Sequence, residues 1–451
     1  MGIQNLPASL QSVIQQGWLE HRFEKALKAK LGFRSIADRE PFLANIGETI
    51  TKTRTGLLPA ITTALAPAAN TDLTSGLTPQ NYGVEQYVLA VNQYAANMML
   101  NVKTSKVAID NLFLRNAYTL GEQAFRSVDT LAQMALFNAY MGGNTRVRVT
   151  LGAPAVTISV DDIRGFQNTW NSEGQVVAIS VSNPVNVTVG ADVYSLTGSA
   201  ADGSNVSTTP GGISGTLTFS GNVTVADATA GNAVVSAVAP YIMRPASSAG
   251  VMAATTAAIA AGTQTNAAKL TMEMVLTAKA TMAANGVPVV EDTGMYHLYL
   301  DPLQATGLYS DPAFQMFFRG QVTTEEYRRG VVAELLGVRL QETNLNPVQP
   351  LSGVGTVRRG ALCGQGALVE GVFTGTAYAD TEGVEDEGMI TMVEDIAHVT
   401  REPLDALKQV VTQSWAYIGG FAVPSDITTN TQTIPTANNS SFKRGIILES
   451  L

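Results

Sequence analysis

The sequence predicts an α+β protein that is organised around one long helix, with an all-β block inserted after that helix. Three observations predict this class. A helical stripe runs from about Thr104 to Met141, short alternating runs fill residues 143–245, and strands alternate with helices again from residue 266. We therefore expect a spine helix against which a sheet is laid.

The spine helix is predicted by its two ends and by its stripe. Thr104 and Ser105 offer capping hydroxyls, and Gly142 with Gly143 ends the helix. Glycine inside a helix costs about 1 kcal/mol relative to alanine, so an internal glycine makes sense where another backbone packs closely. A coiled coil is the alternative, but the stripe lacks a leucine or isoleucine seam. The stripe that we expect to pack against a sheet comprises Leu114, Ala117, Gly121, Ala124, Val128, Leu131 and Ala135.

Composition limits the classes of function. The 451 residues are 45% hydrophobic, so two or three domains with their own cores are expected. Only 14% are charged, against about 25% in ordinary globular proteins, which leaves large neutral surfaces. The net charge of −9 argues against nucleic-acid binding as the main activity. Because Cys363 is the only cysteine, an internal disulfide and zinc sites built on several cysteines are excluded.

The N-terminal region predicts a docking arm followed by a hairpin. Residues 1–45 mix apolar and basic side chains, and Glu20 with Glu24 dilutes the charge, so docking is favoured over nucleic-acid or membrane contact. Within 46–95, two extended polar runs, Glu48–Thr55 and Val84–Tyr94, flank a loop rich in Pro, Ala, Asn and Gly. Such a hairpin needs a neighbouring molecule for stability, and a disordered insertion is the alternative.

The remaining elements follow in order. Residues 143–245 predict a small sandwich or barrel with its own core, and 246–265 a linker without a membrane span. From residue 266, an α+β region is expected. Its elements are a helix from Asn266 to Asn285, a strand 295–300, short helices 302–308 and 312–319, a helix Glu325–Leu336 and a strand Val338–Glu342. Further strands are expected in the ranges 361–373, 390–399 and 407–423. The absence of a signal-peptide core favours a soluble protein from a reducing compartment.

The search for catalytic chemistry is negative. His21, His297 and His398 lie in separate segments without metal-ligand spacing, and no phosphate-binding loop or Gly-x-Ser-x-Gly elbow occurs. Cys363 lies in an apolar strand, where an inert thiol is favoured. The acidic run within 380–395 lacks the ordered spacing of a calcium loop and predicts a solvated loop. We therefore expect no enzyme activity, no cofactor and no metal site.

Three motifs carry a family resemblance. They are Tyr296-His-Leu-Tyr-Leu-Asp-Pro302, Leu308-Tyr-Ser-Asp-Pro-Ala-Phe314 and the segment Tyr327–Thr343 with its Leu-Leu-Gly-Val-Arg turn. In this order, with the polar hairpin and the spine helix, the chain resembles the major capsid proteins of tailed double-stranded DNA bacteriophages. The resemblance implies the fold shared with the herpesvirus capsid floor. It also implies that the hairpin is the extended E-loop, in which Lys52 and Arg54 contact an adjacent subunit.

The resemblance also implies domains and a function. The spine region (96–142) and residues 389–451 correspond to the peripheral domain, and residues 266–388 to the axial domain. The implied function is self-assembly as hexamers and pentamers into an icosahedral virion head, built in the host cytoplasm with a scaffolding protein and a portal. The head would enclose double-stranded DNA without sequence-specific binding, which a net charge of −9 fits. The alternatives are an encapsulin-like compartment, a surface adhesin and an enzyme.

The block at 143–245 departs from the minimal pattern of that family. Its ten charges sum to −2, which gives no reason for it to face DNA. Insertions are tolerated where the chain faces solvent. We therefore expect it on the outer surface of a shell, as a built-in decoration.

Overall fold

The computed structural model divides the chain into two compact units. Unit 1 comprises Met1–Ile50, Val88–Leu136 and Leu368–Ala422, and unit 2 comprises Thr51–Tyr87, Phe137–Ala367 and Val423–Leu451. Both units combine helix and sheet, so the predicted α+β class is confirmed. The structure describes residues 32–42, 49–58, 60–62, 84–101, 112–173, 175–202, 211–244, 269–318, 334–351, 355–373, 390–393, 395–401, 410–425 and 440–451.

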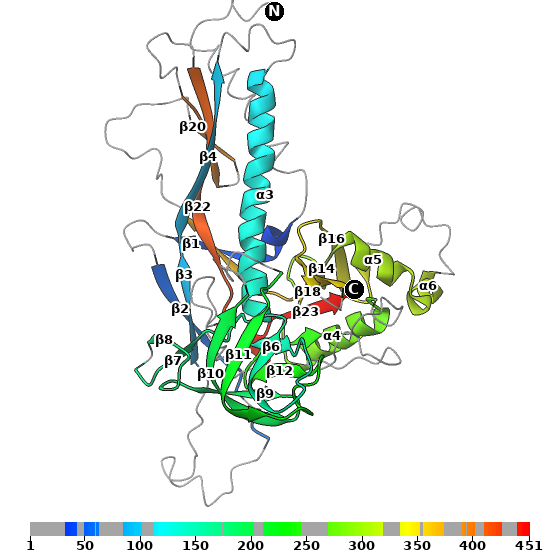
Figure 1. Ribbon diagram of the computed structural model, residues 1–451. Coiled ribbons are helices and arrows are strands. Elements are labelled where there is room, and N and C mark those ends of the chain that lie inside the picture. The colour runs from blue at the N-terminus through cyan, green and yellow to red at the C-terminus, as the bar shows by residue number, and fades with distance from the viewer. Residues whose placement is uncertain are drawn as a thin grey trace, which may run out of the picture. The chain divides into compact units, whose positions relative to one another are not determined.

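Unit 1 is a six-stranded sheet with the long helix α3 (Leu112–Met141) lying along it (Figure 1). The strand order is β1-β19-β22-β21-β20, and β4 pairs with the other edge of β22. The pair β1–β19 is parallel and the other pairs with printed registers are antiparallel. Its elements are the 3-10 turn η2 (Phe33–Ile36), β1 (Ala37–Phe42), β4 (Asn92–Asn101), β19 (Leu368–Phe373), β20 (Ile390–Val393), β21 (Ile396–Arg401) and β22 (Val410–Ala422).

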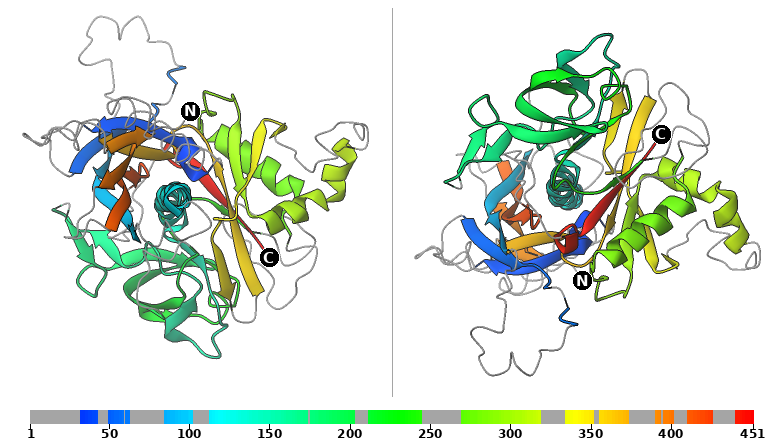
Figure 2. Two further views of the ribbon diagram at one scale, coloured as in Figure 1. Left: turned by 90° about the horizontal axis from the view of Figure 1, so that it is seen from above. Right: turned by 90° about the horizontal axis from the view of Figure 1, so that it is seen from below.

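The sheet of unit 1 packs on one face of α3, which Figure 2 shows end-on. Leu120, Ala124 and Val128 are buried against Trp415 and Tyr417. The small side chains on α3 let the two aromatic rings of β22 approach its backbone, as the predicted spine packing requires. In the predicted stripe, Ala117, Gly121 and Ala135 are also buried, Leu131 is half-buried, and the side chain of Leu114 lies outside the described residues. The helix ends at Met141, as expected, and the predicted start at 104–111 lies outside the described part.

Unit 2 contains a seven-stranded mixed sheet of order β13-β23-β18-β14-β16-β15, with β17 paired to β18. Its core is lined by Met274 and Met282 of α4 against Leu298, Leu362 and Leu448. Its elements are β13 (Ile242–Met243), α4 (Met272–Ala284), β14 (Tyr296–Leu300), α5 (Pro302–Tyr309), α6 (Pro312–Phe318), β15 (Glu334–Leu335), β16 (Val338–Glu342), β17 (Val348–Leu351), β18 (Gly355–Cys363), the 3-10 turn η5 (Ser440–Phe442) and β23 (Gly445–Ser450).

The inserted block is a closed antiparallel barrel within unit 2. Six strands follow the order β5-β12-β9-β10-β11-β6, and a bridge between Val147 and Val160 joins the two edges. The buried cluster that fills it lies entirely between Val147 and Val234, so the predicted separate core is present. The strands are β5 (Asn144–Arg146), β6 (Ala155–Val160), β9 (Val185–Val189), β10 (Asp192–Ala201), β11 (Gly215–Val223) and β12 (Ala233–Ser236), with a side hairpin of β7 (Asn168–Trp170) and β8 (Val176–Ala178).

Two predicted helices differ from the structure. Helix α4 is capped by the Thr271 side chain, which accepts from the Met274 N–H at 3.4 Å, so the expected start at Asn266 is wrong. The expected helix Glu325–Leu336 is wrong at its end, because β15 there pairs with β16. Leu336 and Gly337 both have positive φ, 50° and 78°, which is the two-residue hairpin turn that the Leu-Gly pair makes. Residues 325–333 lie outside the described part.

Several predicted strands are divided or shifted. The run Val84–Tyr94 belongs to two strands, β3 (Val84–Ala90) and β4, and the range 361–373 is split between β18 and β19. The range 390–399 is split between β20 and β21. Strand β10, rich in Ser, Gly and Ala, and the short β7 were not predicted because their alternation is weak.

A buried ionic network joins the base of the barrel to the main sheet of unit 2. Glu449 of β23 is 2% exposed, and its carboxylate binds Arg244 Nε at 2.9 Å and Arg359 Nε at 2.9 Å, with Arg146 Nη1 at 3.8 Å. Although burial opposes it, these arginines hold the pKa of Glu449 well below its usual range. Arg146 also pairs with Asp161. One carboxylate therefore fixes β13, β18, β23 and the first strand of the barrel.

We predict that Glu449→Gln destabilises unit 2 strongly, because three arginines would lose a buried counter-charge. Breaking a buried ion pair from one side costs about 3–5 kcal/mol. Amide hydrogen exchange in β18 and β23 should accelerate by about a hundredfold or more. Glu173→Gln, at an exposed barrel position, is the matched control and should change exchange little. Equal protection in the two variants would contradict the role given to Glu449.

Candidate functional site

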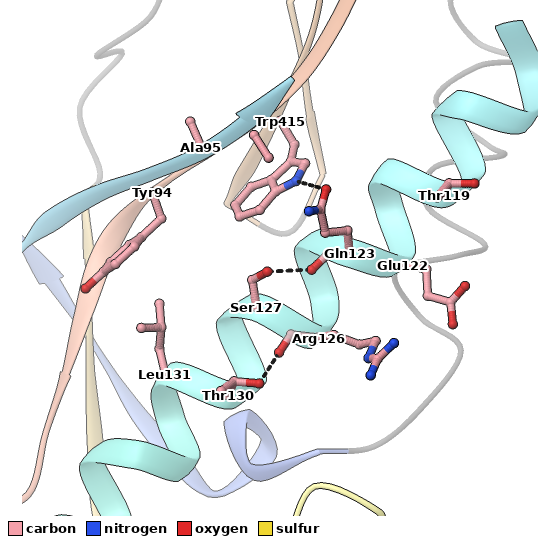
Figure 3. A pocket seen from close by; sticks show the side chains of 11 residues that line it. Tyr94, Ala95, Thr119, Glu122, Gln123, Arg126, Ser127, Thr130, Leu131 and Trp415 are labelled. Atoms are coloured by element: carbon pink, nitrogen blue, oxygen red, sulfur yellow. Dashed lines mark hydrogen bonds between the residues drawn. The ribbon is translucent and has the colours of Figure 1, made fainter. Parts of the chain in front are cut away.

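The described part of unit 1 contains a groove of about 710 Å³ between α3 and the strands β4 and β22 (Figure 3). Trp415 forms its floor, and its indole N–H donates to Gln123 Oε1 at 3.4 Å. Tyr94 lies beside it and stacks at 6.4 Å on Tyr417. The lining residues are Tyr94, Ala95, Ala96, Thr119, Glu122, Gln123, Arg126, Ser127, Thr130, Leu131 and Trp415.

The residues that line the groove do not form a catalytic arrangement. Its helix wall presents hydroxyls that already donate to carbonyls one turn back: Thr119 to Arg115 at 2.9 Å and Ser127 to Gln123 at 2.8 Å. Its lining contains no histidine and no cysteine. Glu122 and Arg126 are exposed and of opposite charge. A neutral, partly aromatic groove of this kind suits a polypeptide segment better than a charged small molecule.

The other candidates for chemistry are inert or separate. Burial raises the pKa of Cys363 to about 12, so this thiol stays protonated. Burial lowers the pKa of His398 to about 4, which keeps its ring neutral, and His297 lies in the other unit. His21 and most of the acidic run 380–395 lie outside the described residues. Among the residues that the structure describes, no group of three His, Cys, Asp or Glu side chains could hold a metal ion.

The hairpin that carries Lys52 and Arg54 is a two-stranded sheet of β2 (Thr49–Thr55) and β3. Lys52 and Arg54 are half-buried on one face of β2, and the Arg54 Nη2 group donates to the Gly366 carbonyl at 3.3 Å within the same chain. The threonines on the other face are exposed. The inter-subunit role of the two cations therefore stays a prediction.

Sequence reasoning missed an apolar segment that follows β2. Leu57 is 67% exposed and Ile61 is 79% exposed, with Leu58 between them at 53%. Isolated exposed apolar residues need no explanation, but three of them within five positions indicate a contact surface. The signal was present in the sequence as Gly-Leu-Leu-Pro-Ala-Ile directly after a polar strand.

A buried cluster fixes the start of the described chain in unit 1. Glu370 of β19 is fully buried, and it binds Arg34 Nη2 at 2.8 Å and the Tyr417 hydroxyl, which donates at 2.8 Å. The Arg34 guanidinium also lies 5.7 Å from the centre of the Tyr417 ring. Burial and the neighbouring Glu370 raise the pKa of Tyr417, so its hydroxyl remains a donor. The cluster ties η2 and β1 to β19 and β22.

Asp129 of α3 caps the same turn from the helix side. Its Oδ1 accepts from the Arg34 backbone N–H at 3.0 Å, while Oδ2 is buried without a hydrogen-bond partner. A Cβ on Gly32 would collide with this carboxylate, which explains the glycine. Burial raises the pKa of Asp129 from 3.8 to about 6. At neutral pH the Asp129 carboxylate is therefore charged although its burial disfavours the charge.

We predict that Asp129→Asn flattens the pH dependence of unit 1 stability. A raised carboxyl pKa in the folded state stabilises at low pH, and this stabilisation is lost as the pH rises through about 6. Between pH 4.5 and 7 the loss amounts to roughly 2 kcal/mol for the wild type. Hydrogen exchange of the amides in α3 and β22 should reveal this loss of stability in the wild type. The Asp129→Asn variant should not show the loss.

Asp192→Asn, at an exposed barrel position, is the control and should keep the wild-type pH dependence. If Asp129→Asn lowers the stability by the same amount relative to the wild type at pH 4.5 and at pH 7, the role given to the raised pKa of Asp129 is refuted.

Comparisons with known proteins were made for the sequence and for the structure. No family model matches the chain, and no curated protein matches it. Solved structures that match are the capsid of Ralstonia phage GP4 (12% identity, 92% of this chain and 87% of that chain, TM-score 0.47), the capsid of Cyanophage P-SCSP1u (12%, 93% and 88%, 0.46) and the Cyanophage Pam1 capsid asymmetric unit (13%, 95% and 91%, 0.47). All three are structures of phage capsids.

Proposed function

We propose that this chain is the major capsid subunit of a double-stranded DNA bacteriophage, a structural protein that self-assembles into a closed icosahedral head. The observation that carries the proposal is the β2–β3 hairpin. A two-stranded ribbon is marginally stable by itself, and this one is followed by the exposed Leu57, Leu58 and Ile61. A neighbouring copy that covers these side chains would stabilise the ribbon and the apolar segment that follows it.

The charge distribution supports a shell subunit. Six of the ten charges in the barrel are buried, namely Arg146, Arg164, Arg244, Asp161, Asp162 and Asp227. Because these cancel, the four that remain carry the whole net charge of −2. A weakly acidic barrel surface has no attraction for phosphate, so the barrel belongs on the outside of the shell. In the described part of the chain, no helix is long and apolar enough to cross a membrane.

The proposal assigns roles to the parts of the chain. The hairpin at 46–95 is the E-loop, with Lys52 and Arg54 in ionic or hydrogen-bonded contact with an adjacent subunit. The spine region and residues 389–451 form the peripheral domain, and residues 266–388 the axial domain. Hexamers and pentamers, a scaffolding protein and a portal complete a head that is assembled in the host cytoplasm. No cofactor and no metal take part.

We predict that replacing residues 56–80 by a short Gly-Ser linker abolishes shell assembly and leaves a folded, soluble subunit. The deletion removes the exposed apolar segment and keeps both hairpin strands. Electron microscopy and sedimentation should find closed particles that protect DNA from nuclease for the wild type, and only small oligomers for the deletion.

The matched control replaces residues 203–210, which lie between β10 and β11 in the sequence, in the same way and should still assemble. Normal particles from the hairpin deletion would refute the role of the hairpin. Wild-type particles filled with protein in place of DNA would refute the phage capsid assignment.

A further inference from the structure

The base of the barrel holds more buried cations than buried anions. Among the described residues, seven ionisable side chains, each at most 3% exposed, form one network there. Arg164 interacts electrostatically with Arg359 and Glu449, so its pair with an aspartate belongs to the same network. Four positive and three negative charges leave a net charge of +1. The seven are Arg146, Arg164, Arg244, Arg359, Asp161, Asp162 and Glu449.

The excess positive charge arises because two arginines share one carboxylate. Each aspartate of the network pairs with one arginine, so Glu449 alone faces both Arg244 and Arg359. Burial lowers the pKa of Arg244 although Glu449 opposes this, and two neighbouring arginines lower it further. Since a buried charge is tolerated only where an opposite charge compensates it, the network would gain stability from one further negative charge.

The guanidinium of Arg146 is the point at which this network lacks hydrogen-bond acceptors. Its Nε donates to Asp161, but neither Nη1 nor Nη2 has a hydrogen-bond partner among the described residues. Nη1 lies 3.8 Å from Glu449 Oε2, which is beyond hydrogen-bond distance. Arg146 is only 3% exposed, so bulk water does not replace the missing partners. Unmet donors on a buried charged group are costly, and they indicate a bound acceptor.

Charge distinguishes the possible acceptors. Asp161 Oδ1 is also buried without a hydrogen-bond partner, so a water molecule between it and Arg146 would satisfy both groups. Such a water would leave the net charge of the network at +1. A small anion accepts hydrogen bonds from the guanidinium and also supplies the missing charge. Because Asp161 and Glu449 lie beside the same guanidinium, they would repel a divalent anion more strongly than a monovalent one.

We propose that the Nη1 and Nη2 groups of Arg146 bind a small monovalent anion, such as chloride, at the base of the barrel. The bound ion neutralises the buried network and so stabilises the junction between β5 of the barrel and the strands β18 and β23 of the main sheet in unit 2. The inference goes beyond the proposed function, because it requires neither a second copy of the chain nor a shell.

Two measurements on the full wild-type chain test the site with chloride as the probe. Sodium chloride replaces sodium gluconate at constant ionic strength, so that general charge screening does not change. An ion that binds only the folded chain suppresses its opening, so amide hydrogen exchange in β5, β18 and β23 should slow by about tenfold or more. The NMR line of chloride should broaden in the presence of the protein, which reports binding to the folded chain directly.

Three variants locate the effect. Arg146→Met should abolish both responses, whereas Arg148→Met, which removes a partly exposed arginine two positions along the chain, should keep them. Asp161→Asn removes a negative charge beside the ion and keeps an acceptor for Arg146 Nε, so chloride should bind severalfold more tightly. A wild-type chain that shows neither response to chloride, or equal responses from Arg146→Met and Arg148→Met, would overturn the proposal. If Arg146→Met does not fold, Asp161→Asn decides, because unchanged or weaker chloride binding by that variant would also overturn it.

Discussion

Two buried glutamates, Glu370 in unit 1 and Glu449 in unit 2, are the charges on which the rest of the structure depends. Removing a carboxylate from water costs several kcal/mol, so each is tolerated only where cationic or donor groups converge on it. Arg34 and Tyr417 meet Glu370, and Arg146, Arg244 and Arg359 meet Glu449. Each of these two carboxylates thereby holds together segments that lie far apart in the chain.

Part of the small charge content of this protein lies in its interior. Only 14% of the residues are charged, and six of these form the two networks. In the described part of the chain, the exposed residues include large apolar side chains such as Leu57 and Met99. Such a surface recognises other polypeptides by shape and backbone pairing, and it gives little steering toward charged ligands.

The sequence predicted the elements that depend on local signals. The end of α3 at Gly142-Gly143 and the strand β22 follow from periodicity and glycine stops. Glu449 and Asp129 could not be found, because their partners lie 90 or more residues away and no local pattern marks them. The Leu-Gly pair at 336–337 fits both a helix end and a hairpin turn, and tertiary pairing with β16 decided between them. In the candidate site, the polar hairpin was visible and the β4 groove was not, since it needs α3 and β22 together.

The most direct test of the central claim is a density map of purified particles by electron cryo-microscopy. We predict an icosahedral lattice in which the chain fits as hexamers and pentamers, the β2–β3 hairpin lies over an adjacent subunit, and the barrel lies on the outer surface. A map without closed lattice symmetry, or one with the barrel on the inner surface against DNA, would contradict the account.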